Sequence, residues 1–197
     1  DAERAMLGED LVSIPGSGLA EDYQPPASAG TGRNRENLRR AHALLNQAGF
    51  HVRDGARIDP STNKPMVLEL LLNNPREERL ALVYAQSLAT LGITLRARVV
   101  EAAQYQRRLL DFDFDMVVHR WGMSLSPGNE QEHYWSSMAA TRPGSRNYPG
   151  IRSPAIDRII REITTARDQG RFEVAVKALD RLLLAGRYIV PLFHLPV

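Results

Sequence analysis

The chain has 197 residues, of which 43% are hydrophobic and 24% are charged, and its net charge at pH 7 is +2. This composition suits one globular domain. The net charge is small and the basic residues are scattered along the chain, which argues against nucleic acid as a partner. There is no cysteine, which excludes disulfides, thiol catalysis and zinc sites built from thiolates.

Residues 1–33 are rich in proline and glycine, which break any helical or strand period. We predict an irregular connecting segment there, and regular structure from Asn34 onward. An apolar stripe predicts a first helix that ends before Gly49. The stripe consists of Leu38, Ala41, Leu44, Leu45 and Ala48. A short polar hairpin is expected next, around Asp54-Gly55 and residues 60–63.

The centre of the chain is predicted to alternate strands and helices. A nearly continuous apolar run at 66–72 is typical of a strand that is covered on both faces. Asn74 and Pro75 form a helix start, and Gly92 ends that helix. Its buried stripe is predicted to contain Leu80, Val83, Leu88 and Leu91.

A strictly alternating segment at 93–100 predicts the next strand, with residues 93, 95, 97 and 99 facing inward. Strand, helix and strand in this order form a βαβ unit, whose crossover should be right-handed. A helix over 102–110 then leads into a strand over 114–119. The chain is therefore predicted to belong to the α/β class.

The C-terminal part is predicted to hold two helices and a strand. Ser153 and Pro154 start a helix that runs to about Arg167, with isoleucines at 156, 159, 160 and 163 on its buried face. A second helix is expected from Arg171 to Gly186. Residues 188–195 indicate a last strand, in which Pro191 favours an edge position.

The most distinctive stretch begins where the strand at 114–119 runs into Arg120 and Trp121. The following loop contains many Ser, Pro, Gly and Asn residues together with aromatic residues. It has too many turn formers for a helix and too many aromatics for a passive linker. A strand that delivers a tryptophan into such a loop is typical of a ligand cleft. No nucleophile is accompanied by a base, so we predict a binding surface without catalytic residues.

Two patterns that suggest metal sites are incomplete. Asp111, Asp113 and Asp115 copy the opening of a calcium-binding EF-hand loop, but Met116 and Gly122 occupy the positions that need glycine and glutamate. Glu130, Glu132 and His133 lack the HExxH spacing of a zinc site. We therefore predict no metal and no cofactor.

Several motifs recur in order along the chain: FDFDM, RWGMSLSPGNEQ, YWSS, GSRNYPGI and ALDRLLL. Together they resemble the extracellular solute-binding proteins of bacterial ABC importers, family 5. This is the oligopeptide and dipeptide class, and the likeness is to its branch for peptides and microcin C-like peptide conjugates. The resemblance extends over most of the chain, from about Gly30 to Leu192.

The resemblance implies a periplasmic receptor that is not an enzyme and that closes two lobes on a ligand. The implied fold is one α/β lobe of the periplasmic-binding-protein-like fold (class II, cluster C), with a mixed sheet flanked by helices. We expect residues 34–197 to form the C-terminal lobe of a longer receptor. The implied partners are a peptide or peptide-like ligand, the N-terminal lobe of the same receptor and an inner-membrane ABC permease, but no nucleic acid.

The resemblance also implies a set of ligand-binding residues. They are Arg120, Trp121, Ser124, Glu130, Arg146 and Asn147. Two alternatives stay open, because Trp121 could be a core residue and Asn147 could be a turn former. Trp135 is expected to anchor the loop.

One departure from the family pattern concerns the charge of the site. Many oligopeptide receptors carry an aspartate a few residues after the strand-end tryptophan, where it pairs with the ammonium group of the peptide. That position falls near Ser124 here, and no aspartate occurs between Trp121 and Ala155. Either Glu130 replaces the charge, or the amine of the ligand is blocked or absent. The alternative functions are a stand-alone interaction domain and, less favoured, a small α/β hydrolase.

Overall fold

The computed structural model describes residues 2–8, 27, 34–122 and 126–192. Contacts divide the chain into two compact units. One unit comprises residues 1–25 and 122–197, and the other comprises residues 26–121. No helix in these described segments is long and apolar enough to cross a membrane. That both units act within one ligand-binding lobe beginning at residue 34 stays our prediction.

The unit of residues 26–121 begins with helix α2 (Arg35–Gln47) and a small antiparallel sheet. The helix ends before Gly49, whose φ of +89° only glycine adopts readily. The sheet contains β1 (His51–Arg53), β2 (Ala56–Asp59) and β3 (Lys64–Pro65). Asp54 and Gly55 join β1 to β2 with φ of 52° and 79°, as tight hairpins require. The predicted helix and hairpin are thus confirmed.

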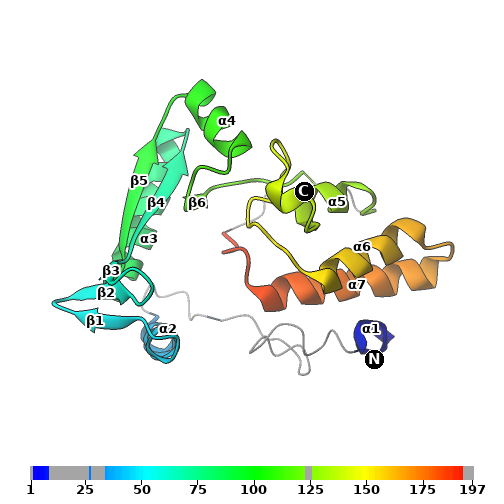
Figure 1. The fold of residues 1–197 in the computed structure, drawn as a ribbon, viewed down its shortest axis with the longest axis horizontal. Coiled ribbons are helices and arrows are strands. Elements are labelled where there is room, and N and C mark those ends of the chain that lie inside the picture. Colours follow the sequence, from blue (N-terminus) through cyan, green and yellow to red (C-terminus); the bar gives the residue numbers. More distant parts are fainter. Residues whose placement is uncertain (1, 9–26, 28–33, 123–125, 193–197) are drawn as a thin grey trace. The chain divides into compact units, whose positions relative to one another are not determined.

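A parallel sheet follows, made of β4 (Val67–Leu72), β5 (Thr94–Val99) and β6 (Met116–Val117) in the order β5-β4-β6 (Figure 1). Helix α3 (Pro75–Ala89) connects β4 to β5, and helix α4 (Ala102–Leu110) connects β5 to β6. The predicted βαβ unit is therefore present. Strand β6 is shorter than the predicted strand over 114–119.

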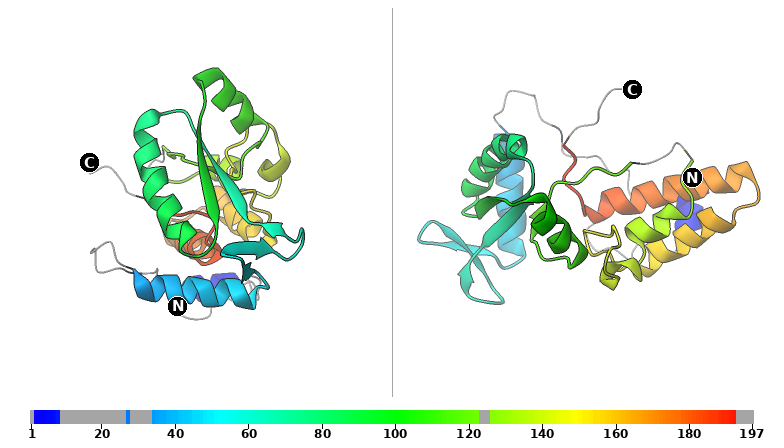
Figure 2. Two further views of the ribbon diagram at one scale, coloured as in Figure 1. Left: turned by 90° about the vertical axis from the view of Figure 1, so that its left-hand side faces the viewer. Right: turned by 90° about the horizontal axis from the view of Figure 1, so that it is seen from above.

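Helix α3 lies along β4 and β5 (Figure 2), but its buried face differs from the predicted one. Leu80 is 37% exposed and Val83 is 63% exposed, whereas Ala81 is 1% exposed and packs with Leu70 and Leu72 of β4. A small side chain at the contact lets the helix approach the sheet closely, and this turns the larger residues outward. Val99, predicted to face inward, is also partly exposed at 39%.

Buried Arg57 ties the antiparallel sheet to its surroundings within this unit. Its side chain is completely buried, and its Nε donates a hydrogen bond to the carbonyl of Leu91 at 2.9 Å. Its Nη1 donates to Asn46 Oδ1 and to the carbonyl of Phe50, each at 2.8 Å. A guanidinium can satisfy several acceptors at once, so one residue fixes β2 against α2 and the turn before β5.

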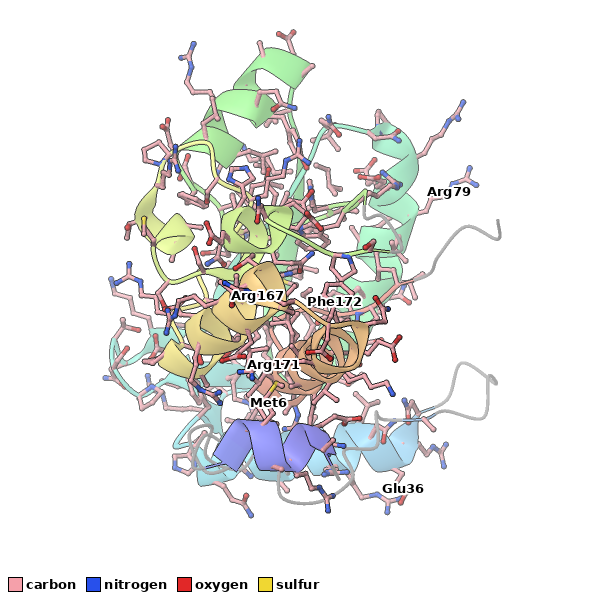
Figure 3. All side chains as sticks on the ribbon, turned by 90° about the vertical axis from the view of Figure 1, so that its right-hand side faces the viewer. Met6, Glu36, Arg79, Arg167, Arg171 and Phe172 are labelled. Atoms are coloured by element: carbon pink, nitrogen blue, oxygen red, sulfur yellow. The ribbon has the colours of Figure 1, made fainter. Side chains whose placement is uncertain are left out.

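The other unit is mainly helical. It contains α1 (Ala2–Leu7), α5 (Glu130–Trp135), a 3-10 turn η2 (Ala139–Thr141), α6 (Pro154–Thr165) and α7 (Gln169–Gly186). Ser153 caps α6 as predicted, and the isoleucines at 156, 159, 160 and 163 are buried. Helices α6 and α7 pack together, with Arg171 near the start of α7 (Figure 3). Arg171 Nε donates a hydrogen bond to the Glu162 carboxylate of α6 at 2.9 Å.

Three local predictions for this unit are wrong. Ala2–Leu7 are helical and pack on α7, where Arg181 pairs with Glu3 at 3.1 Å. The aromatic loop contains helix α5, although its composition argued against a helix. Residues 188–192 form no strand, because Arg187 ends α7 with a φ of 52° and Pro191 lacks a backbone N–H. The rest of the predicted last strand, 193–195, lies outside the described residues.

Candidate ligand-binding site

The carboxyl ends of β4, β5 and β6 lie at one edge of the parallel sheet, and each is followed by a connection. The connection after β4 enters α3, and the connection after β6 leads to Trp121. Because β5 and β6 lie on opposite sides of β4, the chain leaves β4 in one direction and later returns on the other. Ligands of open α/β sheets bind at such a switch point, outside the carboxyl ends of the strands.

An ion pair joins these two connections. Arg120 Nη2 lies 3.0 Å from Glu77 Oε1, in the first turn of α3. The Arg120 side chain is 67% exposed, whereas that of Glu77 is only 12% exposed. The pair therefore presents its cation to solvent and keeps its anion toward the protein.

Trp121 follows directly and is half-buried. Its ring packs edge-to-face on His119, with ring centroids 4.7 Å apart and an interplanar angle of 83°. One residue before His119, the carbonyl of Val118 accepts a hydrogen bond from Tyr105 Oη at 3.0 Å, which fixes the approach of the chain. Half-burial suits a residue that lines a cleft, and the cleft interpretation of Trp121 stays our prediction.

Glu130, in the other unit, turns its carboxylate onto its own loop. Oε1 accepts hydrogen bonds from the backbone N–H of Gly128 at 2.8 Å and from Gln131 Nε2 at 3.1 Å. The hydrogen bond from Gly128 lowers the pKa of Glu130 below its ordinary value. Gln131 in turn accepts a hydrogen bond from Trp135 Nε1 at 3.0 Å. Glu130 is thus the outer end of a network that anchors buried Trp135, as predicted for that tryptophan.

Asn147 is completely buried, and its amide is used within the loop. Nδ2 donates to the carbonyls of Ser136 and Ile151, and Oδ1 accepts from the N–H of Ile151, all at 2.9 Å. These contacts hold together the segment between η2 and α6. The geometry favours the turn-forming role for Asn147 over direct contact with a ligand.

We expect Asn147→Ala to lower the free energy of unfolding of this chain by roughly 2–3 kcal/mol, because buried backbone groups lose their partners. The matched control is Asn129→Ala in the same loop, where the exposed side chain makes no capping hydrogen bond and the cost should stay within ~0.5 kcal/mol. Urea unfolding followed by circular dichroism measures both. Equal losses in the two variants would contradict the assigned role.

The two remaining predicted ligand-binding residues are Arg146 and Ser124. Arg146 is exposed, and its positive charge partly offsets the burial that raises the pKa of Tyr148. Ser124 lies outside the described residues. Arg120 and Trp121 are thus gathered at one sheet edge, while Glu130, Arg146 and Asn147 belong to the other unit. The sequence reasoning missed Glu77, although its place one turn after a parallel strand was a usable signal.

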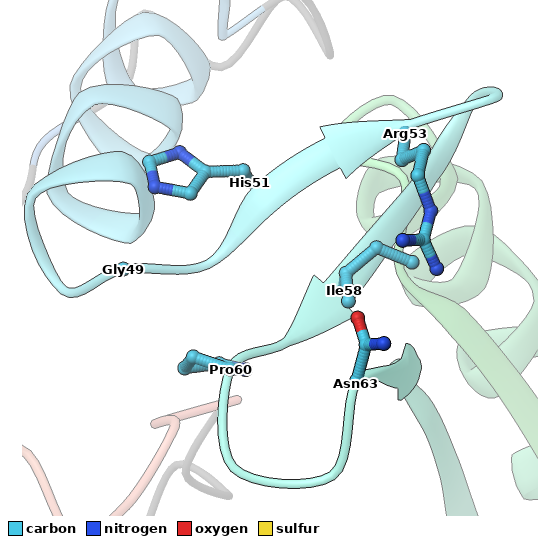
Figure 4. A pocket seen from close by; sticks show the side chains of 6 residues that line it. All are labelled: Gly49, His51, Arg53, Ile58, Pro60 and Asn63. Atoms are coloured by element: carbon cyan, nitrogen blue, oxygen red, sulfur yellow. The ribbon is translucent and has the colours of Figure 1, made fainter.

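Two further observations bear on other kinds of site. Among the described residues, no group of His, Asp or Glu is arranged to hold a metal ion. A hollow of about 250 Å³ lies on the antiparallel sheet, lined by Gly49, His51, Arg53, Ile58, Pro60 and Asn63 (Figure 4). It is smaller than the usual ~300–1,000 Å³ of ligand pockets, and its sheet is not the one whose strand β6 precedes Arg120 and Trp121.

The family model of the bacterial extracellular solute-binding proteins, family 5 (middle), matches residues 7–165. The chain belongs to this family. The match includes Trp121, the aromatic loop and α6, and so confirms the resemblance seen in the motifs. Family 5 comprises binding proteins rather than enzymes.

Relatives and solved structures agree with the family. The chain is 45% identical to protein y4wM of Sinorhizobium fredii over 98% of its own length and 29% of that protein. It is 39% identical to the peptidoglycan-binding protein YepA of Agrobacterium fabrum over 99% of its own length and 32% of YepA. The chain therefore spans about a third of the length of these relatives.

The fold itself is that of one part of a periplasmic-binding-protein-like receptor. The oligopeptide-binding protein AppA of Bacillus subtilis, solved with a nonapeptide, superposes with a TM-score of 0.69 at 19% identity. The superposition covers 95% of this chain and 38% of AppA. The predicted α/β lobe architecture is thereby confirmed.

Proposed function

We propose that this family 5 chain is the ligand-binding lobe of the substrate-binding component of an ABC importer, and that the receptor captures oligopeptides or peptide-like solutes in the periplasm. The observation that carries the proposal is the family match over residues 7–165, which runs through both units and includes Trp121. A relative that is named as peptidoglycan-binding supports a peptide-like ligand.

The proposed mechanism is hinge closure. A ligand bridges this lobe and an N-terminal lobe, and the closed receptor is recognised by an inner-membrane permease. A ligand shifts the open–closed equilibrium only as far as it binds the closed form more tightly. The carboxyl edge of the β5-β4-β6 sheet supplies this lobe's half of the site, with Arg120 and Trp121 as the proposed ligand contacts. Ser124, Glu130 and Arg146 are proposed to line the cleft from the loop.

The proposal predicts that this chain alone binds peptides at least tenfold more weakly than the full-length receptor. With half of the cleft missing, water competes for every polar contact that closure would otherwise shield. Calorimetric titration of a tripeptide pool into both proteins measures the difference. Equal affinities would contradict the two-lobe mechanism.

The ligand class is tested by native mass spectrometry of the full-length receptor purified without added ligand. A retained adduct that fragments as a peptide or peptide conjugate is the expected result. A retained sugar or metal chelate, with no binding of any tripeptide, would contradict the proposed peptide function while leaving the family assignment intact.

A further inference from the structure

The charge arrangement at the sheet edge indicates what kind of group the ligand presents there. Arg120 follows β6 and Glu77 follows β4, so their ion pair spans the switch point where a ligand of such a sheet binds. The cation is the exposed partner, at 67% of its side chain against 12% for Glu77. The charged group of this pair that is accessible to a ligand is therefore the Arg120 guanidinium.

Glu77 holds Arg120 in a way that leaves binding capacity. The carboxylate contacts Nη2 at 3.0 Å, which occupies one corner of the guanidinium. A guanidinium carries five N–H donors in a planar fork and can bind a second carboxylate through two parallel hydrogen bonds. Because Glu77 is nearly buried and lies in the first turn of a helix, it orients the plane of that fork before any ligand arrives.

Other acidic residues bear on this preference. No aspartate occurs between Trp121 and Ala155, and the acidic residues of this stretch are Glu130 and Glu132. The Glu130 carboxylate accepts hydrogen bonds from Gly128 and Gln131 within its own loop. Glu101 follows β5, which is separated from β6 by the central strand β4.

We propose that this site selects peptide-like solutes that carry a carboxylate group and a blocked or absent amine, with the carboxylate bound by Arg120 beside the Trp121 ring. Glu77 is the positioning residue. The inference rests on the proposed peptide function and adds the charge of the ligand group. Because the Arg120–Glu77 pair is nearly neutral as a unit, recognition depends on the geometry of the fork more than on net charge.

The test uses the full-length receptor, freed of retained ligand, and four tripeptide pools. The pools combine a free or acetylated amino terminus with a free or amidated carboxyl terminus. We expect the acetylated pool with a free carboxylate to bind about tenfold more tightly than the acetylated, amidated pool, as for a charge-assisted pair. Arg120→Gln should abolish that preference. Arg120→Lys should lose most of it, because an ammonium cannot form the two parallel bonds.

The matched control is Arg98→Gln, which removes another exposed arginine (58% of its side chain) that is paired with Glu69 on the same sheet, at 3.3 Å. It should keep the wild-type preference. Glu77→Gln should keep the preference but weaken it several-fold, because Arg120 stays charged but loses its ionic anchor. Melting curves of all variants check that each is folded.

Each outcome decides a separate point. Binding of all four pools with equal affinity, or an unchanged preference in Arg120→Gln, would overturn the role of Arg120 and leave the peptide function standing. Tightest binding of the pool with a free amine and an amidated carboxyl group would show that the site reads a cation instead. If no pool binds the wild-type receptor, the peptide function fails and this inference fails with it.

Discussion

Trp135→Ala is expected to lower the free energy of unfolding by roughly 3–5 kcal/mol, the cost of a large cavity in a packed core. Trp135 is 2% exposed, and the hydrogen bond that its indole N–H donates to Gln131 would be lost as well. Gln131 is itself buried, so its carbonyl oxygen would be left without its partner. The loop that carries Glu130 and Asn147 should lose its anchor in the same step.

Trp121→Ala is the matched comparison and should cost only about 1–2 kcal/mol, because part of the half-buried ring already contacts water. In the full-length receptor the order should reverse, and Trp121→Ala should cause the larger loss of peptide affinity among variants that remain folded. Urea unfolding by far-ultraviolet circular dichroism avoids a readout that depends on tryptophan itself. Equal destabilisation by both substitutions would mean that Trp121 belongs to the core rather than to the cleft.

Gly92→Ala is expected to lower the free energy of unfolding by about 3–4 kcal/mol, through backbone conformation and crowding together. Gly92 has a φ of +80°, which costs a residue with a side chain roughly 1–2 kcal/mol. A Cβ at this position would also lie 2.9 Å from the backbone nitrogen of Arg57 and 3.1 Å from the carbonyl oxygen of Gly55. The Arg57 nitrogen cannot move away without disturbing its own hydrogen bond of 2.7 Å to Gly92 O.

Gly55→Ala isolates the steric part of that cost. Gly55 has nearly the same φ, +79°, but a Cβ there meets nothing within 4 Å. It should therefore carry only the conformational cost of roughly 1–2 kcal/mol. Thermal unfolding of the two variants side by side gives the difference. A smaller loss for Gly92→Ala than for Gly55→Ala would contradict the close approach of the β-hairpin to the turn before β5.

Local chemistry accounts for the parts of the fold that the sequence predicted. Asn74 and Ser153 accept hydrogen bonds from backbone N–H groups at the starts of α3 and α6. Gly49 and Gly92 have the positive φ that ends a helix. The run at 66–72 became the central strand of the parallel sheet, although only its second half, from Leu70 to Leu72, is buried as predicted and Val67 is 41% exposed. These signals act within a few residues, so a sequence can display them.

The wrong predictions concern elements whose structure depends on contacts with residues that are distant in the sequence. The composition of the first segment did not predict α1, whose helix depends on contacts with α7, including the Arg181–Glu3 pair. Leu80 and Val83 were wrongly assigned to the buried face of α3, because Ala81 makes the close contact with β4, whereas Leu91 is buried as predicted. Helix α5 depends on the burial of Tyr134 and Trp135 by residues elsewhere in the fold, which no local sequence pattern identifies. Tertiary packing overrides helix propensity when the free energy gained by burial exceeds the differences in propensity, which are a few tenths of a kcal/mol per residue.

The candidate site divides in the same way. The sequence by itself determined the family, the strand-end Arg120 and Trp121 and the absence of an aspartate in the loop, because these are matters of residue identity and order. Only the tertiary structure decided that Glu77 pairs with Arg120 and that the Asn147 amide is used within its own loop. Glu77 and Arg120 are 43 residues apart in the chain, and parallel strand pairing brings their connections to one edge. A side chain's partners depend on such pairing, which residue order alone does not reveal.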